Sequence, residues 1–217
     1  TYDINFKVIF VLGVSSNISL LLAVYCNTPP QLKTYAILIK IGTWNDLMSV
    51  CCDFFTMQRM LVVPGNLLYL STGPCALIST RACYLGYCVQ LFTLVFTLYI
   101  MTASFAYRLW VLHRPPPSNR NVRIIAAMLL TPPALVSVTF TFAQADLDIV
   151  KEFLRHNAPT YLSEPGALAG HTGMTFQLVF TILFVACTPP PAYAAILVIR
   201  SKVRNPPRKL ETSLSEY

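Results

Sequence analysis

Charged residues are scarce in this sequence of 217 residues, since they make up only 12% of it, against about 25% in soluble proteins. Acidic residues are the scarcer sign, with 9 Asp and Glu against 16 Lys and Arg, while 55% of the residues are hydrophobic. A soluble protein of this size would need more charge to cover its surface, and a disordered chain would need far lower hydropathy. The composition therefore indicates a membrane protein.

Motifs for catalysis and metal binding are also missing. The seven cysteines contain no Cys-x-x-Cys spacing, the three histidines are scattered, and neither a glycine-rich phosphate loop nor a nucleophile elbow occurs. We therefore expect no enzymatic activity, no cofactor and no metal site. A net charge of +7 would suggest a nucleic-acid partner in a soluble protein. Here the basic residues flank apolar runs, so we expect membrane lipid as the partner and no nucleic acid.

Long stretches between charged residues predict the membrane spans, because a helix needs about 20 apolar residues to cross hydrocarbon. Four runs are clear, and a fifth is polar. The predicted spans are residues 5–26, 34–57, 82–107, 124–145 and 172–199. The sequence thus predicts an all-α polytopic membrane helix bundle over residues 1–200, followed by a cytoplasmic tail or truncated third intracellular loop at 201–217.

The second span is the polar one, because it contains Lys40, Asp46 and Asp53. The two aspartates are seven residues apart and share a helical face, which should point into the bundle. Lys40 is expected to extend toward the inner surface. The rival stretch, Met60–Thr80, is uncharged but punctuated by proline and glycine, so we interpret it as a loop.

Basic residues in the connecting segments predict the orientation. With the N-terminus outside, ten lie inside: Lys33, Arg108, Arg114, Arg120, Arg123, Arg200, Lys202, Arg204, Arg208 and Lys209. Five then lie outside: Lys7, Arg59, Arg81, Lys151 and Arg155. The asymmetry favours an N-terminus outside and a C-terminus inside.

Polar residues inside the spans are candidate functional residues, because they are costly in hydrocarbon. Asn17 follows Gly13 by four residues, and the glycine permits the close helix contact that would bring Asn17 to Asp46. Two interpretations stay open. The pair either joins two helices, or forms a hydrated ion or proton site that biases a conformational switch.

Two further features lie at the predicted inner half of the bundle. Arg108, beside Tyr107 and Trp110, is either an anchor at the inner membrane surface or a signalling residue. Pro189, Pro190 and Pro191 interrupt the fifth span, since each proline removes a helical hydrogen bond. The break is either a static kink or a hinge used in signalling.

Several short segments occur in an order that resembles a known family. They are Leu32-Lys33-Thr34-Tyr35-Ala36-Ile37-Leu38, Asn45-Asp46-Leu47, Gln58-Arg59, Gly73-Pro74-Cys75, Cys83-Tyr84-Leu85-Gly86-Tyr87, Ser104-Phe105-Ala106-Tyr107-Arg108 and Pro191-Ala192-Tyr193. Together they resemble the nematode serpentine chemoreceptors of class delta (Srd), which are seven-helix G-protein-coupled receptors distantly similar to rhodopsin.

The resemblance implies roles for individual residues. Asn17 resembles the asparagine of the first helix, and Asp46 resembles the second-helix aspartate that binds sodium and senses activation in many such receptors. Tyr107-Arg108 stands where those receptors keep an acidic-Arg-aromatic triplet, with Tyr107 in place of the acid. Cys75 resembles the outer cysteine that often pairs with the second outer loop. Residues 144–173 contain no cysteine, which leaves Cys75 free or paired locally.

The expected function is therefore that of a chemosensory receptor with five of the seven helices. It would bind an extracellular small molecule or peptide and signal to a heterotrimeric G protein at the plasma membrane, by resemblance the ciliary membrane of sensory neurons. A ligand pocket is expected around Gln90, Thr93, Phe176 and Gln177.

The chain begins at Thr1 rather than methionine and has no sixth and seventh helix, so we expect a fragment that does not signal alone. The alternative function is a small transporter or channel subunit with a polar path at Asp46 and Asp53.

Overall fold

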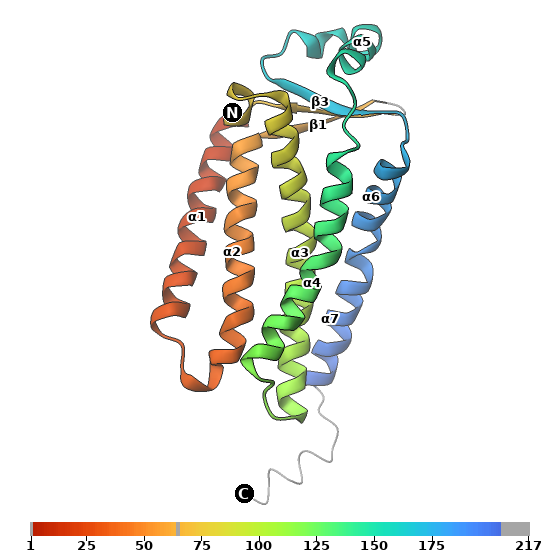
Figure 1. Ribbon diagram of the computed structural model, residues 1–217. Helices are drawn as coiled ribbons and strands as arrows, with labels where there is room; N and C mark the ends of the chain where they lie inside the picture. Colours follow the sequence, from red (N-terminus) through yellow and green to blue (C-terminus); the bar gives the residue numbers. More distant parts are fainter. Residues whose placement is uncertain (1, 64–65, 205–217) are drawn as a thin grey trace, which may run out of the picture.

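Five long helical rods form the protein in the computed structural model, which describes residues 2–63 and 66–204 (Figure 1). The rods are α1 (Tyr2–Cys26), α2 (Lys33–Thr56), α3 (Thr80–His113), α4 (Asn119–Thr141) and the consecutive pair α6 (Phe176–Cys187) and α7 (Pro189–Arg204). The rods α1, α3, α4 and α6–α7 are long and apolar enough to cross a membrane. The expected all-α membrane helix bundle is thereby confirmed.

The centre of the bundle is α3, which packs against α2, α4 and α7, while α1 packs on the outer side of α2. Both α3 and α4 extend beyond the predicted inner limits of their spans, because a charge-free run marks the hydrocarbon layer and not the ends of a helix. Their starts are capped. Ser79 and Ser118 each accept a hydrogen bond from the backbone N–H three residues ahead, which satisfies a donor that the first helical turn leaves unpaired.

The last rod is interrupted at Thr188, between α6 and α7. The three prolines that follow have no N–H group, so the carbonyls of residues 185–187 lose their helical donors. Thr188 closes the end of α6, since both its N–H and its hydroxyl donate to the carbonyl of Phe184, at 3.0 and 2.6 Å. The tail at 205–217 lies outside the described residues.

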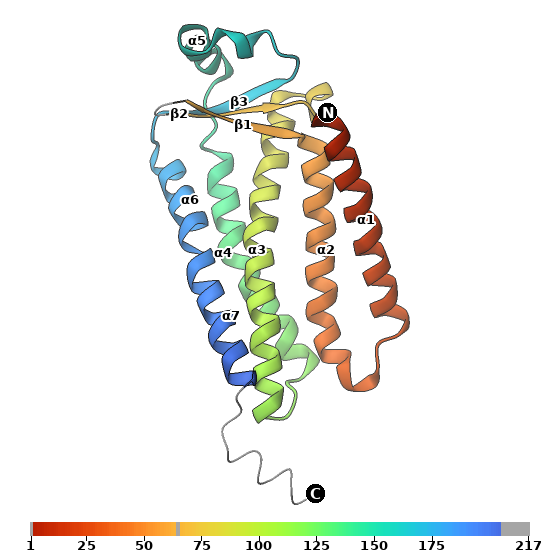
Figure 2. The ribbon, with the colours of Figure 1, turned by 180° about the vertical axis from the view of Figure 1, so that it is seen from behind.

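A small antiparallel sheet lies across one end of the bundle, with strand order β1-β2-β3 (Figures 1 and 2). Its strands are β1 (Gln58–Val63), β2 (Asn66–Ser71) and β3 (Ala167–Thr172). Helix α5 (Leu147–Asn157) covers the outer face of the sheet. Three 3-10 turns complete the connections: η1 (Pro30–Leu32), η2 (Pro74–Leu77) and η3 (Pro159–Leu162).

The stretch that sequence patterns assigned to a loop, Met60–Thr80, thus contains most of a β-hairpin and the turn η2. Its β2 strand pairs with β3, which lies almost a hundred residues further along the chain, and Leu68 faces Gly170 in the register. Because this partner is distant in the sequence, the nearby proline and glycine residues wrongly indicated a loop. Pro64 and Gly65, on which the loop interpretation partly depended, lie outside the described residues.

The side chains of β2 pack alternately against α5 and against the bundle, because successive side chains of a strand point to opposite faces. Leu68 and Leu70 are buried in a cluster with Val150 and Leu154 of α5. Tyr69, between them, is buried on the other side. There it belongs to a second hydrophobic cluster, whose buried members are Tyr69, Tyr84, Cys88, Phe140, Ala143, Ala169 and Leu178. The sheet is therefore a cap that seals this end of the bundle.

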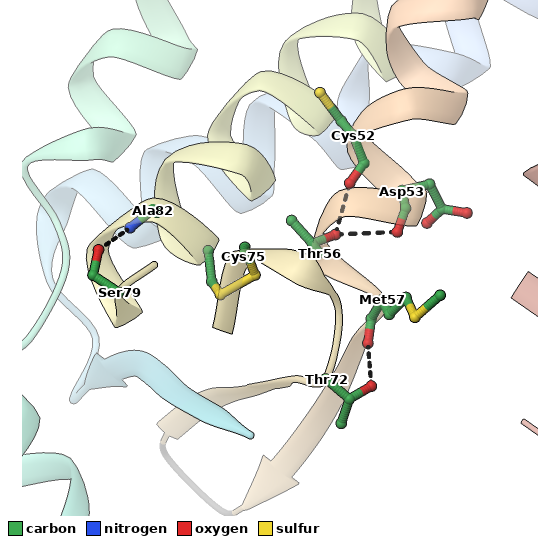
Figure 3. The surroundings of a disulfide bond; sticks show 9 residues. Cys52, Asp53, Thr56, Met57, Thr72, Cys75, Ser79 and Ala82 are labelled. Carbon is green, nitrogen blue, oxygen red and sulfur yellow. Dashed lines mark hydrogen bonds between the residues drawn. A yellow bond between two sulfur atoms is a disulfide. The ribbon is translucent and has the colours of Figure 1, made fainter. Parts of the chain in front are cut away.

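A disulfide between Cys75 and Cys83 ties η2 to the first turns of α3 (Figure 3). This local pairing supplies the partner of Cys75 that the sequence left open. The adjoining backbone is equally tight, because a Cβ added at Gly73 would collide with the carbonyl oxygen of Phe55 at the end of α2. The disulfide and this close approach hold the ends of α2, the sheet and α3 together.

Candidate functional site

A set of buried and half-buried polar residues joins α2 to α3. We call this set the α2–α3 polar contact, and it comprises Asn45, Asp46 and Asp53 from α2 and Gln90, Thr93 and Thr97 from α3. Each helix presents these groups at helical spacing on one face, because residues three, four and seven apart lie one above another. The two faces meet because no bulky residue separates the helices at Gly86, where an added Cβ would lie 2.8 Å from Thr56 Cγ2.

The inner part of this contact is centred on Thr97. Asn45 is only 5% exposed, and its Nδ2 group donates to the carbonyl of Thr93 at 2.9 Å and to Thr97 Oγ1 at 2.8 Å. The Thr97 hydroxyl in turn donates to Asp46 Oδ1 at 3.0 Å. Asn45 Oδ1 is buried without a hydrogen-bond partner in the described part of the chain. Thr97 thus bonds both to the Asp46 carboxylate and to the Asn45 amide, whose oxygen has no hydrogen-bond partner among the described residues.

The outer part of the contact is simpler. Gln90 Nε2 donates to Asp53 Oδ1 at 2.9 Å, so Asp53 also receives its hydrogen bond from α3. Gln90 and Thr93 were assigned to a ligand pocket by position in the sequence, whereas the structure uses both to pair with α2. Both aspartates of the polar span therefore face the bundle, as their spacing indicated.

Asn17 lies differently from the expectation that it contacts Asp46. Its Nδ2 group donates to the carbonyl of Gly13 in its own helix, at 2.8 Å. The close approach of α1 to α2 does occur at the glycine, because a Cβ on Gly13 would lie 2.9 Å from the Val50 side chain. Asp46 instead bonds across to α3, which presents the hydroxyl of Thr97 at its level.

The four residues expected to line a ligand pocket are not brought together. Phe176 is 80% exposed, and Gln177 is exposed beside it at the start of α6. The cavity between α3, α4 and α6 is lined instead by residues such as Leu91, Val95 and Thr181, and it measures about 10 Å³. Pockets for drug-sized ligands occupy about 300–1,000 Å³. The sequence specified the depth of these residues along the helices but not the rotation of the helices, so their role in a pocket stays a prediction.

Two members of the polar contact, Asn45 and Thr97, were missed by sequence reasoning. The spacing of Gln90, Thr93 and Thr97 is three, four and seven residues, which marks a polar stripe on an otherwise apolar helix. Asn45 directly precedes Asp46 and was named only within the segment that carries the family resemblance. That stripe was the available signal.

At the opposite end of the bundle, Arg108 is held by an aromatic residue of α2. Its Nε and Nη2 groups donate to the Tyr35 hydroxyl at 3.0 and 2.6 Å. The ring of Tyr107 stacks on the same tyrosine, with centroids 5.4 Å apart. The guanidinium also lies 5.4 Å from the ring centroid of Phe105. A neutral phenol therefore restrains this arginine where an acidic neighbour would form an ion pair.

A buried histidine links the cap to the bundle. His171 of β3 is fully buried, its Nδ1 lies 2.6 Å from the carbonyl of Ala143, and desolvation lowers its pKa below the ordinary value. The neutral ring therefore donates through Nδ1–H to the end of the α4 segment. The hydroxyl of Tyr84 beside it donates to the carbonyl of Phe140 at 2.6 Å. These bonds give His171 a structural role.

Apolar helices long enough to cross a membrane, a polar contact between α2 and α3 and an arginine at the far end of α3 define an integral membrane protein of the serpentine type. Comparison with known protein families identifies one family over nearly the whole chain. The model of the family described as "Serpentine type 7TM GPCR chemoreceptor Srd" matches residues 2–217, and the chain belongs to this family. The family resemblance stated from the sequence is confirmed.

Individual relatives are similar at the level expected within a divergent receptor family. Serpentine receptor class delta-18 of Caenorhabditis elegans is 28% identical over 200 residues, which cover 90% of this chain and 59% of that protein. Serpentine receptor class delta-19 of the same organism is 27% identical, covering 89% and 58%. Class delta-30 is 29% identical, covering 70% and 47%. The chain thus spans less than two thirds of the length of these relatives.

Proposed function

We propose that these helices belong to a chemosensory receptor that binds an extracellular small molecule or peptide and signals to a heterotrimeric G protein. The observation that carries the proposal is the Arg108–Tyr35 contact. The cation of Arg108 is held by two hydrogen bonds to a neutral phenol and not by an ion pair. It is therefore suited to exchange Tyr35 for a group of a partner protein. A ligand that prefers one arrangement of the helices would shift that equilibrium.

The proposed orientation has the sheet and α5 outside the cell. The described acids of the cap region, such as Glu152 and Glu164, lie at this end, and the Cys75–Cys83 disulfide there suits an oxidising compartment. The opposite end carries Lys33, Arg114 and Arg123 and would face the anionic inner leaflet. The proposed location is the plasma membrane, and by family resemblance the ciliary membrane of sensory neurons.

The orientation is tested by epitope tags at the two ends of the chain in unpermeabilised cells. We expect antibody to reach a tag before Thr1 but to reach a tag after Tyr217 only once the membrane is permeabilised. The reason is the excess of basic residues at the end opposite the sheet, which resists translocation. Labelling of both tags from the same side would contradict five membrane crossings.

The α2–α3 polar contact is the proposed switch within the bundle. Asp46 and the unpaired Oδ1 atom of Asn45 offer two oxygen ligands of the kind that a hydrated sodium ion or proton relay requires. Asn17 would contribute only after a shift of α1, since it bonds to Gly13. The break at Pro189, Pro190 and Pro191 is the proposed hinge, because the carbonyls before it have no helical donors.

The ligand would bind between α3 and α6 beneath the cap. Gln90, Thr93, Phe176 and Gln177 lie on the elements concerned, although only a rearrangement would join them in one cavity. The transporter alternative gains no support from the site, because the hydrogen bonds of Asp46 and Asp53 to α3 join two helices and no cavity of the described residues contains both aspartates.

The coupling proposal is tested with a G-protein dissociation reporter in cultured cells. Two proteins are compared: the 217-residue chain, and a chimera in which the remaining helices of serpentine receptor class delta-18 follow residue 204. The chimera is expected to respond to a member of a panel of volatile and water-soluble compounds, because it supplies a complete cytoplasmic crevice. The chain alone is expected to stay silent.

A chimera carrying Arg108→Ala tests whether the response depends on this arginine. Its surface expression is measured beside that of the unmodified chimera. Ligand-dependent signalling from the 217 residues alone would contradict the proposed need for further helices. A surface-expressed chimera without basal or ligand-dependent signalling, for any co-expressed G protein, would contradict the receptor function itself.

A further inference from the structure

A cavity of about 280 Å³ opens between α1, α2 and α4 at the end of the bundle opposite the sheet. Its cationic residues are Lys33 and Lys40 of α2 and Arg123 of α4. Tyr25 and Asn119 also line it. We call it the inner basic cavity. Three positive side chains converge on it from two helices whose N-termini, with their positive dipole ends, lie at the same level.

These cations have no carboxylate partner in residues 2–63 and 66–204. The ion pairs in this described part of the chain, Arg59–Glu164 and His156–Glu152, lie in the cap at the other end. The next acid on α2 is Asp46, six residues beyond Lys40 and about 9 Å along the helix axis, and it bonds to α3. Like charges that line one cavity repel each other, so an anion between them would lower this repulsion.

Two contacts preorganise the cavity. The Lys40 ammonium lies 3.8 Å from the ring centroid of Tyr25, a cation–π contact that holds the side chain toward the cavity mouth. Asn119 Oδ1 accepts a hydrogen bond from the Thr34 hydroxyl at 2.7 Å. Its amide nitrogen then remains as a donor at the edge of the cavity, since it bonds to none of the described residues. The site therefore offers charge and a directed hydrogen bond.

The remaining wall of the cavity is apolar. Val24, Ala36 and Ile37 line it, and the neighbouring Tyr25 of α1 is 59% exposed. A free phosphate ion would leave this apolar wall uncovered. A molecule with a phosphate head and a hydrocarbon tail would satisfy both halves, and the cavity lies at the end of the bundle where α2 and α4 begin.

We propose that the inner basic cavity binds the phosphorylated headgroup of an anionic phospholipid. The phosphate lies between Lys33, Lys40 and Arg123, Asn119 donates to a headgroup oxygen, and an acyl chain lies along the apolar wall formed by Val24, Ala36 and Ile37. In the proposed orientation this lipid belongs to the inner leaflet. It would couple α1, α2 and α4 and thereby set the position of the Tyr35-bearing turn of α2.

The experiment measures lipid binding by native mass spectrometry of the full chain in detergent. Phosphatidylinositol 4-phosphate is compared with phosphatidylcholine, and soluble inositol bisphosphate serves as the headgroup without a tail. The cavity variant is Lys33→Gln/Lys40→Gln/Arg123→Gln. The matched control is Arg114→Gln/Arg120→Gln/Arg200→Gln, which removes the same charge from the same end of the bundle outside the cavity.

We expect the wild-type chain to bind one phosphoinositide at least tenfold more tightly than phosphatidylcholine. The cavity variant should lose at least tenfold of this affinity, while the control should stay within about twofold of the wild type. Equal losses in the two variants would overturn the site in favour of diffuse attraction. Binding of soluble inositol bisphosphate as tightly as of the lipid would overturn the lipid as the ligand.

A second measurement uses the wild-type chain alone, so its result does not depend on whether the variants fold. A photoactivatable phosphoinositide should label residues 24–40 and 119–123, and labelling confined to other helices would overturn the proposal. Neither measurement depends on which face is inside the cell or on G-protein coupling. The lipid site can therefore fail while the receptor function stands, and the reverse.

Discussion

The chimera carrying Arg108→Ala is expected to lose about 10- to 100-fold of its G-protein activation at unchanged surface expression. This is the range expected when a central interface arginine that contributes about 1.5–3 kcal/mol is removed. Tyr35→Phe should act in the opposite direction and raise basal activity, because it removes the hydroxyl that accepts both guanidinium hydrogen bonds and retains the ring. The readout is the dissociation reporter, normalised to surface receptor.

The matched control is Arg114→Ala. Arg114 lies at the same end of the bundle and has its own aromatic contact, with its guanidinium 4.9 Å from the Trp110 ring centroid. It carries the same charge but lies outside the Tyr35 contact. Equal loss of activation in the two arginine variants would mean that net charge matters and that Arg108 has no special position.

Thr97→Val is expected to destabilise the bundle by about 1–3 kcal/mol. The substitution keeps the shape of the side chain but removes the hydroxyl that accepts from Asn45 and donates to Asp46. A carboxylate and an amide group would then each lose a partner inside the bundle, where water replaces it poorly. Thermal unfolding of the chain in detergent, followed with a thiol-reactive dye that detects exposure of the buried Cys88, measures the loss.

Thr102→Val serves as the control, because it is the same substitution on the same helix. The Thr102 hydroxyl donates to the carbonyl of Leu98 within α3 and bridges no other helix. Its loss should cost less than about 0.5 kcal/mol, since the accepting carbonyl keeps its own helical hydrogen bond. Equal destabilisation by the two variants would contradict a special role for Thr97 in joining α2 to α3.

Sequence reasoning about the site succeeded for the aspartates and failed for their partners. Asp46 and Asp53 were expected to face the bundle because charge is costly against lipid, and that cost is a property of the residue. Which neighbour supplies the hydrogen bond depends on the rotation of α3 about its axis. The sequence therefore did not identify Thr97 as a partner. Gln90, which was assigned to a ligand pocket, donates to Asp53 of α2.

The cap shows the same limit on a larger scale. The strand β2 was hidden because its pairing partner β3 lies far along the chain, and proline and glycine between β1 and β2 suggested a loop. The sequence left Cys75 either free or paired locally, and cysteine spacing alone did not decide between these alternatives. Only the return of the chain over the end of the bundle brings these segments together.

The sequence by itself determined that this protein is an all-α membrane helix bundle of the serpentine chemoreceptor family. Hydrocarbon excludes charge and requires internal backbone hydrogen bonds, so local composition alone selects helices of that length. The tertiary structure decided the cap, the pairing of Asp46 with Thr97, the restraint of Arg108 by Tyr35 and the inner basic cavity. Each of these depends on the rotation and depth of one helix against another, which side-chain packing sets between residues distant in the chain.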